Sequence, residues 1–246
     1  MKNLVKKGIS VSLILCCGYF AITNLTQNHT SQKVSDGLHK LQQLENKDIK
    51  DVQRKISLAT TKMNQNNSQV PFSQRYQSSV IIGDSIAEAL LDYRVLDRTI
   101  VLASRGTRCD SLDDQIQSAT YLSPQNIFIC VGMNDLVFNR GDSDLFISKY
   151  KHTIAHIREV LPDANIFINS ILPMTSVGYQ ETKYNHLDCV FNKAIIAMCE
   201  EMNITYIDND MLIDGEDVDA YESDGIHPKY GFYPMWLDYM ASQAGI

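Results

Sequence analysis

Three short segments of this sequence carry the residue types that acyl transfer requires. In chain order they are Gly83-Asp84-Ser85, Gly132-Met133-Asn134-Asp135 and Asp224-Gly225-Ile226-His227-Pro228. A serine hydroxyl attacks an acyl carbon once a histidine takes its proton, and a carboxylate holds the imidazole in the required tautomer. An asparagine amide can donate to the oxyanion that forms. The three segments together therefore predict a nucleophilic acyl-transfer site.

Each role follows from the chemistry of the side chain. Ser85 is the predicted nucleophile, His227 the general base, and Asp224 the carboxylate that orients the imidazole from three residues away. Asn134 and the backbone N–H of Ser85 are predicted oxyanion donors. Taken singly, Ser85 could equally cap a helix, and Asn134 could form a turn. Asp135 is expected to brace its loop rather than take part in the reaction.

The order and spacing of these segments resemble the SGNH/GDSL hydrolase family, over roughly residues 76–246. The resemblance implies a serine esterase that uses no cofactor and no metal. The G-x-S-x-G elbow of the α/β-hydrolases is absent, because Ala87 stands where its second glycine would be. The resemblance also implies a further oxyanion donor, a backbone N–H in the loop after the second strand.

That loop departs from the family pattern. Gly106 is its only glycine, and Cys109 stands where a second glycine is common. Either residue could supply the N–H, and we choose Gly106. Arg105 and Arg108 lie beside it and could hold an anionic substrate through bidentate contacts. Alternatively, both arginines are solvated side chains on an acidic domain.

Alternating apolar runs and helical patterns predict the elements that must bring these residues together. The expected strands are Ser79–Gly83, Thr99–Ala103, Asn126–Val131, Asn165–Ser170 and Ile204–Asp208. The expected helices are Ile86–Tyr93, Ser111–Ala119, Asp142–Val160, Thr182–Met202 and Tyr230–Ala244. This alternation predicts an α/β fold, a three-layer α/β/α sandwich around a parallel sheet of roughly five strands. Ligands bind at the carboxyl ends of such strands, which is where the segments fall.

Charge divides the chain near residue 75. Residues 1–75 contain eleven Lys/Arg and four Asp/Glu, a balance of +7, whereas residues 76–246 have a balance of −14. We therefore expect a membrane segment at 1–23, a polar helical stalk or linker at 24–75, and the hydrolase domain at 76–246. The acidic domain argues against a nucleic-acid partner, because phosphate groups need a basic surface.

The N-terminus is typical of an export or anchor signal. Lys2, Lys6 and Lys7 precede an apolar run from Gly8 to Ile22, and no clear cleavage site follows. We favour an uncleaved signal anchor in the cell membrane with the catalytic domain outside the cytoplasm. A cleaved signal, and thus a secreted protein, is one alternative, and a buried N-terminal helix is another.

Apolar residues between 34 and 63 recur at helical spacing. They fit a stalk that self-associates as a short coiled coil, or an amphipathic helix lying on the catalytic domain. The six cysteines lack metal-ligand spacing, and sequence alone cannot pair them as disulfides. His152 and His156 lie on one helix face without an evident third ligand, and His186 could line a cleft.

Together these features predict a membrane-anchored serine esterase acting outside the cytoplasm on small O-acyl groups, acetyl above all, of carbohydrates. Three alternatives stay open at this stage. The same site could act on lipid esters, as a lysophospholipase does, or transfer an acyl group to a sugar hydroxyl. A degenerate family member could instead serve only as a binding module.

Overall fold

A computed structural model describes residues 70–183 and 187–246 of the chain. The predicted membrane segment, nearly all of the predicted stalk, and His186 lie outside the described residues. None of the helices in the described ranges is long and apolar enough to cross a membrane.

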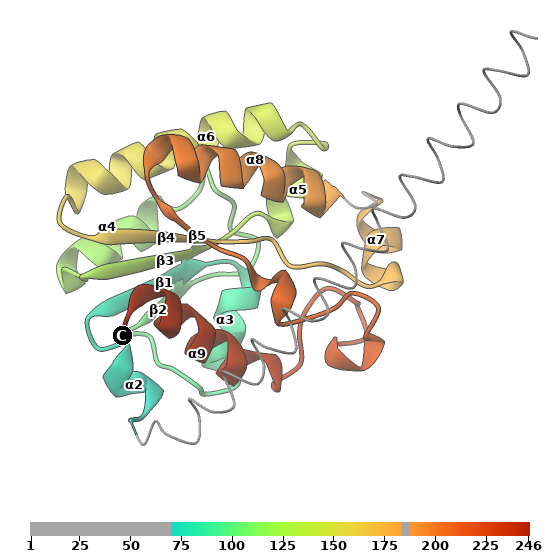
Figure 1. The fold of residues 1–246 in the computed structure, drawn as a ribbon, viewed down its shortest axis with the longest axis horizontal. Helices are drawn as coiled ribbons and strands as arrows, with labels where there is room; N and C mark the ends of the chain where they lie inside the picture. Colours follow the sequence, from blue (N-terminus) through green and yellow to red (C-terminus); the bar gives the residue numbers. More distant parts are fainter. Residues whose placement is uncertain (1–69, 184–186) are drawn as a thin grey trace, which may run out of the picture. The chain divides into compact units, whose positions relative to one another are not determined.

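Five parallel strands form one sheet, in the order β2-β1-β3-β4-β5 (Figure 1). Their bounds are β1 Ser79–Gly83, β2 Val101–Ala103, β3 Asn126–Cys130, β4 Asn165–Asn169 and β5 Thr205–Ile207. Gly83 pairs with both Ala103 and Cys130, so the carboxyl ends of the three neighbouring strands lie level with one another. All residues of β1 and β3 are buried, as expected for strands covered on both faces.

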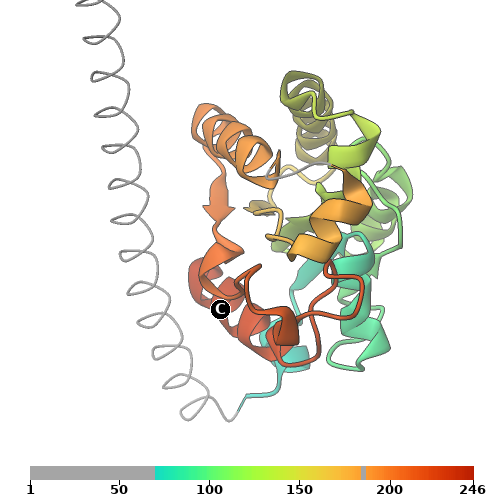
Figure 2. The ribbon, with the colours of Figure 1, turned by 90° about the vertical axis from the view of Figure 1, so that its right-hand side faces the viewer.

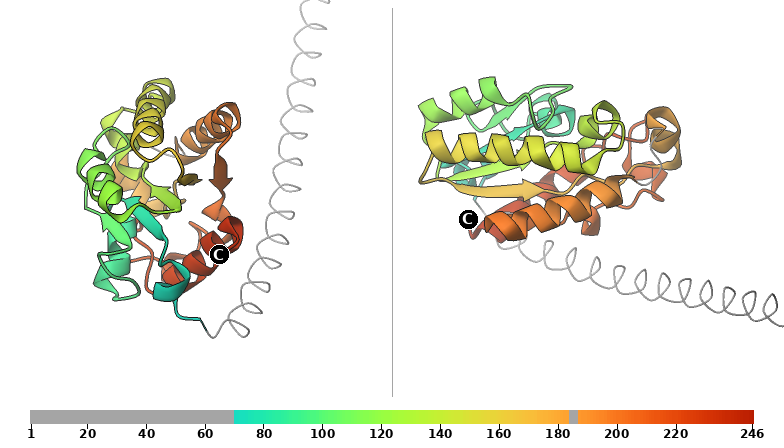
Figure 3. Two further views of the ribbon diagram at one scale, coloured as in Figure 1. Left: turned by 90° about the vertical axis from the view of Figure 1, so that its left-hand side faces the viewer. Right: turned by 90° about the horizontal axis from the view of Figure 1, so that it is seen from above.

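Helices cover both faces of the sheet (Figures 1 and 3). One face carries α3 (Ser85–Asp92) and α9 (Phe232–Ala244), and the other carries α4 (Asp113–Leu122), α6 (Ser143–Val160) and α8 (Leu187–Met202). Tyr93, just after α3, packs on Tyr233 of α9 with ring centroids 5.2 Å apart. Phe146 of α6 stacks on Phe191 of α8 at 4.8 Å. The predicted parallel sheet with flanking helices is confirmed.

Two short helices were not predicted from the sequence, α5 (Met133–Phe138) and α7 (Ser176–Thr182). The single helix expected over Thr182–Met202 is wrong, because Thr182 ends α7 and α8 begins at Leu187. Lys183 terminates α7 in the left-handed conformation, with φ of 61°. Figure 2, which faces the carboxyl edge of the sheet, shows α7 beside the segment that leads into α9.

A further short helix, α2 (Phe72–Arg75), precedes the boundary drawn at residue 76. Arg75 forms an ion pair with Asp238 of α9, a carboxylate that is almost fully buried. This contact ties the residues just before β1 to the C-terminal helix.

Candidate active site

Ser85 is the first residue of α3, directly after β1. Asp84 caps this helix, because its Oδ1 accepts from the backbone N–H of Ile86 at 3.0 Å. The junction is tightly packed: a Cβ on Gly83 would lie 2.6 Å from Ala87 Cβ and 2.7 Å from the Cys130 carbonyl oxygen. The strand-to-helix turn therefore holds Ser85 at the helix N-terminus, where backbone N–H groups and the helix dipole favour negative charge.

The structure brings Ser85, His227 and Asp224 into hydrogen-bond contact. Ser85 Oγ lies 2.8 Å from His227 Nε2, and His227 Nδ1 lies 2.6 Å from Asp224 Oδ2. These distances match those of a serine activated by a histidine that a carboxylate orients. The serine and the histidine are 142 residues apart in sequence, so the fold alone creates their contact.

Asp224 also organises its own loop. Its Oδ1 accepts from the backbone N–H groups of Ile226 at 2.8 Å and His227 at 3.0 Å. Burial raises the pKa of Asp224, but these hydrogen bonds and the His227 imidazole outweigh burial and lower the pKa overall. The ionised carboxylate can therefore stabilise the positive charge that His227 gains during proton transfer.

Helix α7 and its N-cap residue Thr175 pack against the loop that carries Asp224 and His227. The N–H of Thr175 donates to the carbonyl of Gly225 at 2.9 Å. Gly178 of α7 approaches so closely that a Cβ there would lie 2.6 Å from the same carbonyl oxygen. A glycine inside a helix often marks such a close approach, and it was the available sequence signal for this contact.

Asn134 lies in the first turn of α5. Its Nδ2 donates to the Thr107 carbonyl at 3.1 Å and to Asp84 Oδ2 at 3.3 Å. Because an amide nitrogen carries only two hydrogens, both are engaged in this structure. Asn134 thus joins the loop after β2 to the segment that carries Ser85.

The loop after β2 contains both residues considered as backbone donors. Gly106 has φ of 77°, the left-handed region that favours glycine, and a Cβ there would meet nothing within 4 Å. The N–H of Cys109 instead donates to Asp135 Oδ2 at 3.0 Å, and the Cys109 carbonyl accepts from Thr153 Oγ1 at 2.6 Å. The Cys109 N–H is therefore engaged within the protein, and Asp135 braces the loop as expected.

Asp84 is a functional candidate whose role the sequence pattern did not indicate. The side chain is buried, and burial raises its pKa to about 7, against the lowering influence of the Ile86 hydrogen bond and of His227. Its position beside Ser85 was visible in the sequence. Its burial and its contact with Asn134 depend on the approach of α5.

The two arginines are both engaged with carboxylates. Arg105 contacts Glu88 at 3.0 Å and Asp92 at 2.9 Å, both on α3. Arg108 contacts Asp110 at 3.1 Å, and its guanidinium carbon lies 3.8 Å from the centroid of the Phe138 ring on α5. An anionic substrate would have to compete with these partners.

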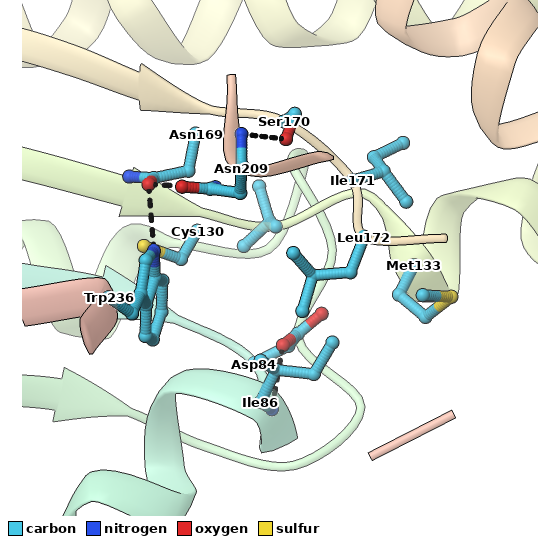
Figure 4. Close-up of a pocket in the computed structure, with 11 residues that line it drawn as sticks. Asp84, Ile86, Cys130, Met133, Asn169, Ser170, Ile171, Leu172, Asn209 and Trp236 are labelled. Atoms are coloured by element: carbon cyan, nitrogen blue, oxygen red, sulfur yellow. Dashed lines mark hydrogen bonds between the residues drawn. The ribbon is translucent and has the colours of Figure 1, made fainter. Parts of the chain in front are cut away.

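A pocket lies at the carboxyl ends of β1, β3 and β4 (Figure 4). Asp84 and Ile86, the two neighbours of Ser85 in sequence, line one side of it, and Asn169, Ser170 and Asn209 line the other. Much of the remaining wall is apolar and includes Cys130, Leu172 and Trp236. The empty volume is about 300 Å³, open solvent included.

Within the described residues, no group of three or more His, Cys, Asp or Glu side chains is placed to hold a metal ion. His152 and His156 lie on α6, away from the three segments in the sequence. Among the described residues, Cys109, Cys130, Cys189 and Cys199 form no disulfide bond.

The serine, the histidine and the aspartate are connected by hydrogen bonds at the carboxyl edge of a parallel sheet. An α/β protein with this arrangement belongs to the class of hydrolases. Residues 81–230 match the GDSL-like Lipase/Acylhydrolase family, and the chain belongs to that family. It is accordingly a carboxylic ester hydrolase.

Solved structures share the fold. A protein of Bacteroides fragilis described as an acylhydrolase has 18% identity and a TM-score of 0.56, covering 68% of this chain and 85% of its own. A GDSL-like lipase from Bacteroides thetaiotaomicron has 19% identity and a TM-score of 0.55, covering 74% and 94%. A search of curated proteins finds no match to this sequence.

Proposed function

We propose that Ser85, His227 and Asp224 are the catalytic triad of an esterase that removes short O-acyl groups, acetyl above all, from carbohydrates. One observation carries the triad: Ser85 Oγ lies 2.8 Å from His227 Nε2, whose opposite ring nitrogen lies 2.6 Å from Asp224. The reaction proceeds without a bound cofactor, as two acyl transfers through a covalent acyl-serine.

In the first transfer, Ser85 Oγ attacks the ester carbonyl carbon while its proton passes to His227 Nε2. Asp224 stabilises the imidazolium that results. The tetrahedral intermediate collapses, the bond to the alcohol oxygen breaks, and His227 returns the proton to that oxygen. In the second transfer, water attacks the acyl carbon while His227 takes its proton. The bond between the acyl carbon and Ser85 Oγ then breaks, His227 returns the proton to Ser85 Oγ, and the carboxylic acid leaves.

The oxyanion of each intermediate is proposed to receive hydrogen bonds from the N–H of Ser85, the N–H of Gly106 and Nδ2 of Asn134. Engagement of the Cys109 N–H with Asp135 supports Gly106 as the donor from its loop. Asn134 must exchange one of its two bonds for the oxyanion. The contact with Asp84 is the longer of the two, at 3.3 Å against 3.1 Å, and is the one we expect to yield.

A short acyl group is supported by the small pocket that Asp84 and Ile86, the sequence neighbours of Ser85, help to line. Its cavity volume is about 20 Å³, which is room for about one water and none for a long acyl chain. Trp236, 1% exposed, is part of the wall and limits how far an acyl chain can extend. A long lipid chain fits this geometry less well than an acetyl or similar group.

The carbohydrate part of the proposal rests on the expected location. Lys2, Lys6 and Lys7 before an apolar run predict a signal anchor that displays the domain outside the cytoplasm, where acylated polysaccharides are available. The stalk at residues 24–75 would hold the enzyme away from the membrane and could also mediate self-association.

The catalytic assignment is tested by covalent capture with the full chain in detergent. A fluorophosphonate probe should label Ser85, as read by mass spectrometry, and Ser85→Ala should abolish both the label and hydrolysis of acetyl esters. Ser111, on the loop after β2, provides a control, since Ser111→Ala should keep both. Label on another serine of folded protein would overturn the assignment.

Location is tested separately in intact cells. Protease added outside should degrade the catalytic domain, and fractionation should find the protein in the membrane. A protected domain would reverse the orientation, and a soluble form beginning near residue 24 would show that the signal is cleaved.

A further inference from the structure

A second hydrogen bond joins the helix that carries the nucleophile to the loop that carries the base. The hydroxyl of Tyr93, the residue directly after α3, donates to Glu222 Oε1 at 2.9 Å, although the two residues are 129 apart in sequence. Burial and, after it, this hydrogen bond raise the pKa of Tyr93, so the phenol keeps its proton and donates. Because Ser85 begins α3 and Tyr93 follows its last residue, the helix contacts the loop at both of its ends.

Glu222 is also part of the turn that contains the base. Its backbone N–H donates to the carbonyl of His227 at 2.8 Å, and its own carbonyl accepts from the N–H of Gly225 at 2.9 Å. The side chain that reaches Tyr93 therefore belongs to the residue that closes the turn holding Asp224 and His227. Since these two backbone bonds tie Glu222 to the turn, a shift of Glu222 would move the backbone of His227 with it.

The ring of Tyr93 is held by packing as well as by this hydrogen bond. Its centroid lies 5.2 Å from that of Tyr233 on α9 and 5.6 Å from that of Tyr230, distances typical of aromatic pairs. Tyr233 is fully buried, whereas Tyr230 is 54% exposed and Glu222 is exposed. A phenylalanine at position 93 can keep both ring contacts, so Tyr93→Phe tests the hydrogen bond alone.

The importance of this second bond changes during the proposed reaction. In the free enzyme, the contact between Ser85 Oγ and His227 Nε2 itself holds the base against α3. Once Ser85 is acylated, its oxygen has no proton to donate and this contact is lost, while His227 must still take a proton from water. Building on the function proposed above, we propose that Tyr93 and Glu222 are positioning residues that hold His227 in place during hydrolysis of the acyl-serine.

The test is Tyr93→Phe in the full chain in detergent, assayed with an acetyl ester. The rate at which acetylated Ser85 is hydrolysed, measured by mass spectrometry after quenching, should fall by about 5- to 10-fold, because His227 is held less well. Since kcat/KM reports only the steps through acylation, it should stay within about 2-fold, while kcat and KM fall together. The rate of fluorophosphonate labelling should be unchanged, because it depends on the free enzyme.

Variants of the acceptor sharpen the test. Glu222→Ala should match Tyr93→Phe, and the double variant should lose no more than either alone, because both remove the same bond. Glu222→Gln keeps an oxygen that can accept and should retain most of the wild-type rate. Tyr121→Phe is the matched control, since Tyr121 is an 81% exposed tyrosine of α4 on the other face of the sheet. This control should leave every rate unchanged.

If Tyr93→Phe fails to fold, Glu222→Ala at its exposed position provides the same measurements. Unchanged hydrolysis of acetylated Ser85 overturns this inference alone, and so does a loss of kcat/KM as large as the loss of kcat. A rise of KM at constant kcat overturns it in favour of a role for Tyr93 in binding the alcohol part of the substrate. Absence of both ester hydrolysis and fluorophosphonate labelling in the wild type overturns the proposed function and this inference with it.

Discussion

The two sides of the candidate site are built in opposite ways. On one side, Asp224 and His227 are three residues apart, and their side chains are 44% and 35% exposed. On the other side, Asp84 and Asp135 are buried carboxylates, and their contacts with Asn134 and Cys109 span 50 and 26 residues of sequence. The first side is assembled locally, whereas the second exists only when β1, α5 and the loop after β2 pack together.

The pKa shifts of the two sides differ in sign. Burial raises the pKa of Asp224, but hydrogen bonds from its own loop lower it overall. Burial dominates at Asp84, whose pKa rises to about 7, and at Asp135, whose pKa is also raised. The local side therefore keeps the charge that the proposed proton transfer needs, while the packed side holds its groups in place around the proposed oxyanion position.

The largest expected effect is on the local side. His227→Ala should lower kcat by about 10³-fold or more, because it removes the group that takes the serine proton. Asp224→Asn should lower kcat less, since backbone hydrogen bonds within the loop can still orient the segment. Steady-state kinetics on an acetyl ester measures both. Turnover near the wild-type rate in His227→Ala would contradict the triad.

The next effect tests the packed side. Asn134→Ala should lower kcat by about 10²–10³-fold with little change in KM, as expected for a donor used mainly in the transition state. Cys109→Ala is the matched control from the neighbouring loop: it keeps the backbone N–H and should retain most activity. A change of KM alone in Asn134→Ala would make Asn134 a substrate-binding residue.

The locally assembled side of the site could be predicted from the sequence, whereas the contacts of the packed side could not. The five strands were predicted because they are continuous apolar runs, and the Asp224–His227 pair because its partners are close in sequence. The short helices α5 and α7 were missed, since six or seven residues give too little periodicity, and α7 contains Gly178. The contacts of Asp84 with Asn134 and of Asp135 with Cys109 could not be derived, because they depend on how separate loops approach.

A smaller effect is expected on the free energy of unfolding, to which Asp84 and Asp224 should contribute with opposite pH dependence. Because the folded-state pKa of Asp84 is raised to about 7, folded protein binds its proton more tightly than unfolded protein does. Its stabilising contribution is present at low pH and lost as pH rises towards 7. The wild-type free energy of unfolding should therefore fall by up to about 4 kcal/mol from this group between pH 4 and 8. Asp84→Asn should lack that loss.

Asp224→Asn is the matched control, because the free energy of unfolding that Asp224 contributes should change with pH in the opposite direction to that of Asp84. The lowered pKa of Asp224 gives stability that is present above the ordinary pKa of an aspartate and lost as pH falls through the folded-state value. Chemical denaturation at a series of pH values measures both variants. Superimposable pH profiles for Asp84→Asn and wild type would show that Asp84 is not held at a raised pKa.

The smallest expected effect concerns substrate charge at the loop after β2, on the packed side. Arg105 and Arg108 are predicted to favour an anionic ester over a neutral one of equal size. Their existing pairs with carboxylates weaken any such contact, so we expect a preference of only about a few-fold in kcat/KM. Replacing both by glutamine should erase the preference while neutral acetyl ester turnover stays within a few-fold. Lys151→Gln with Arg158→Gln on α6 removes the same charge elsewhere and should preserve it. An equal loss on charged and neutral esters would mean that the arginines stabilise the loop through Phe138 and α3. A wild type without any preference would mean that the arginines bind only their carboxylate partners.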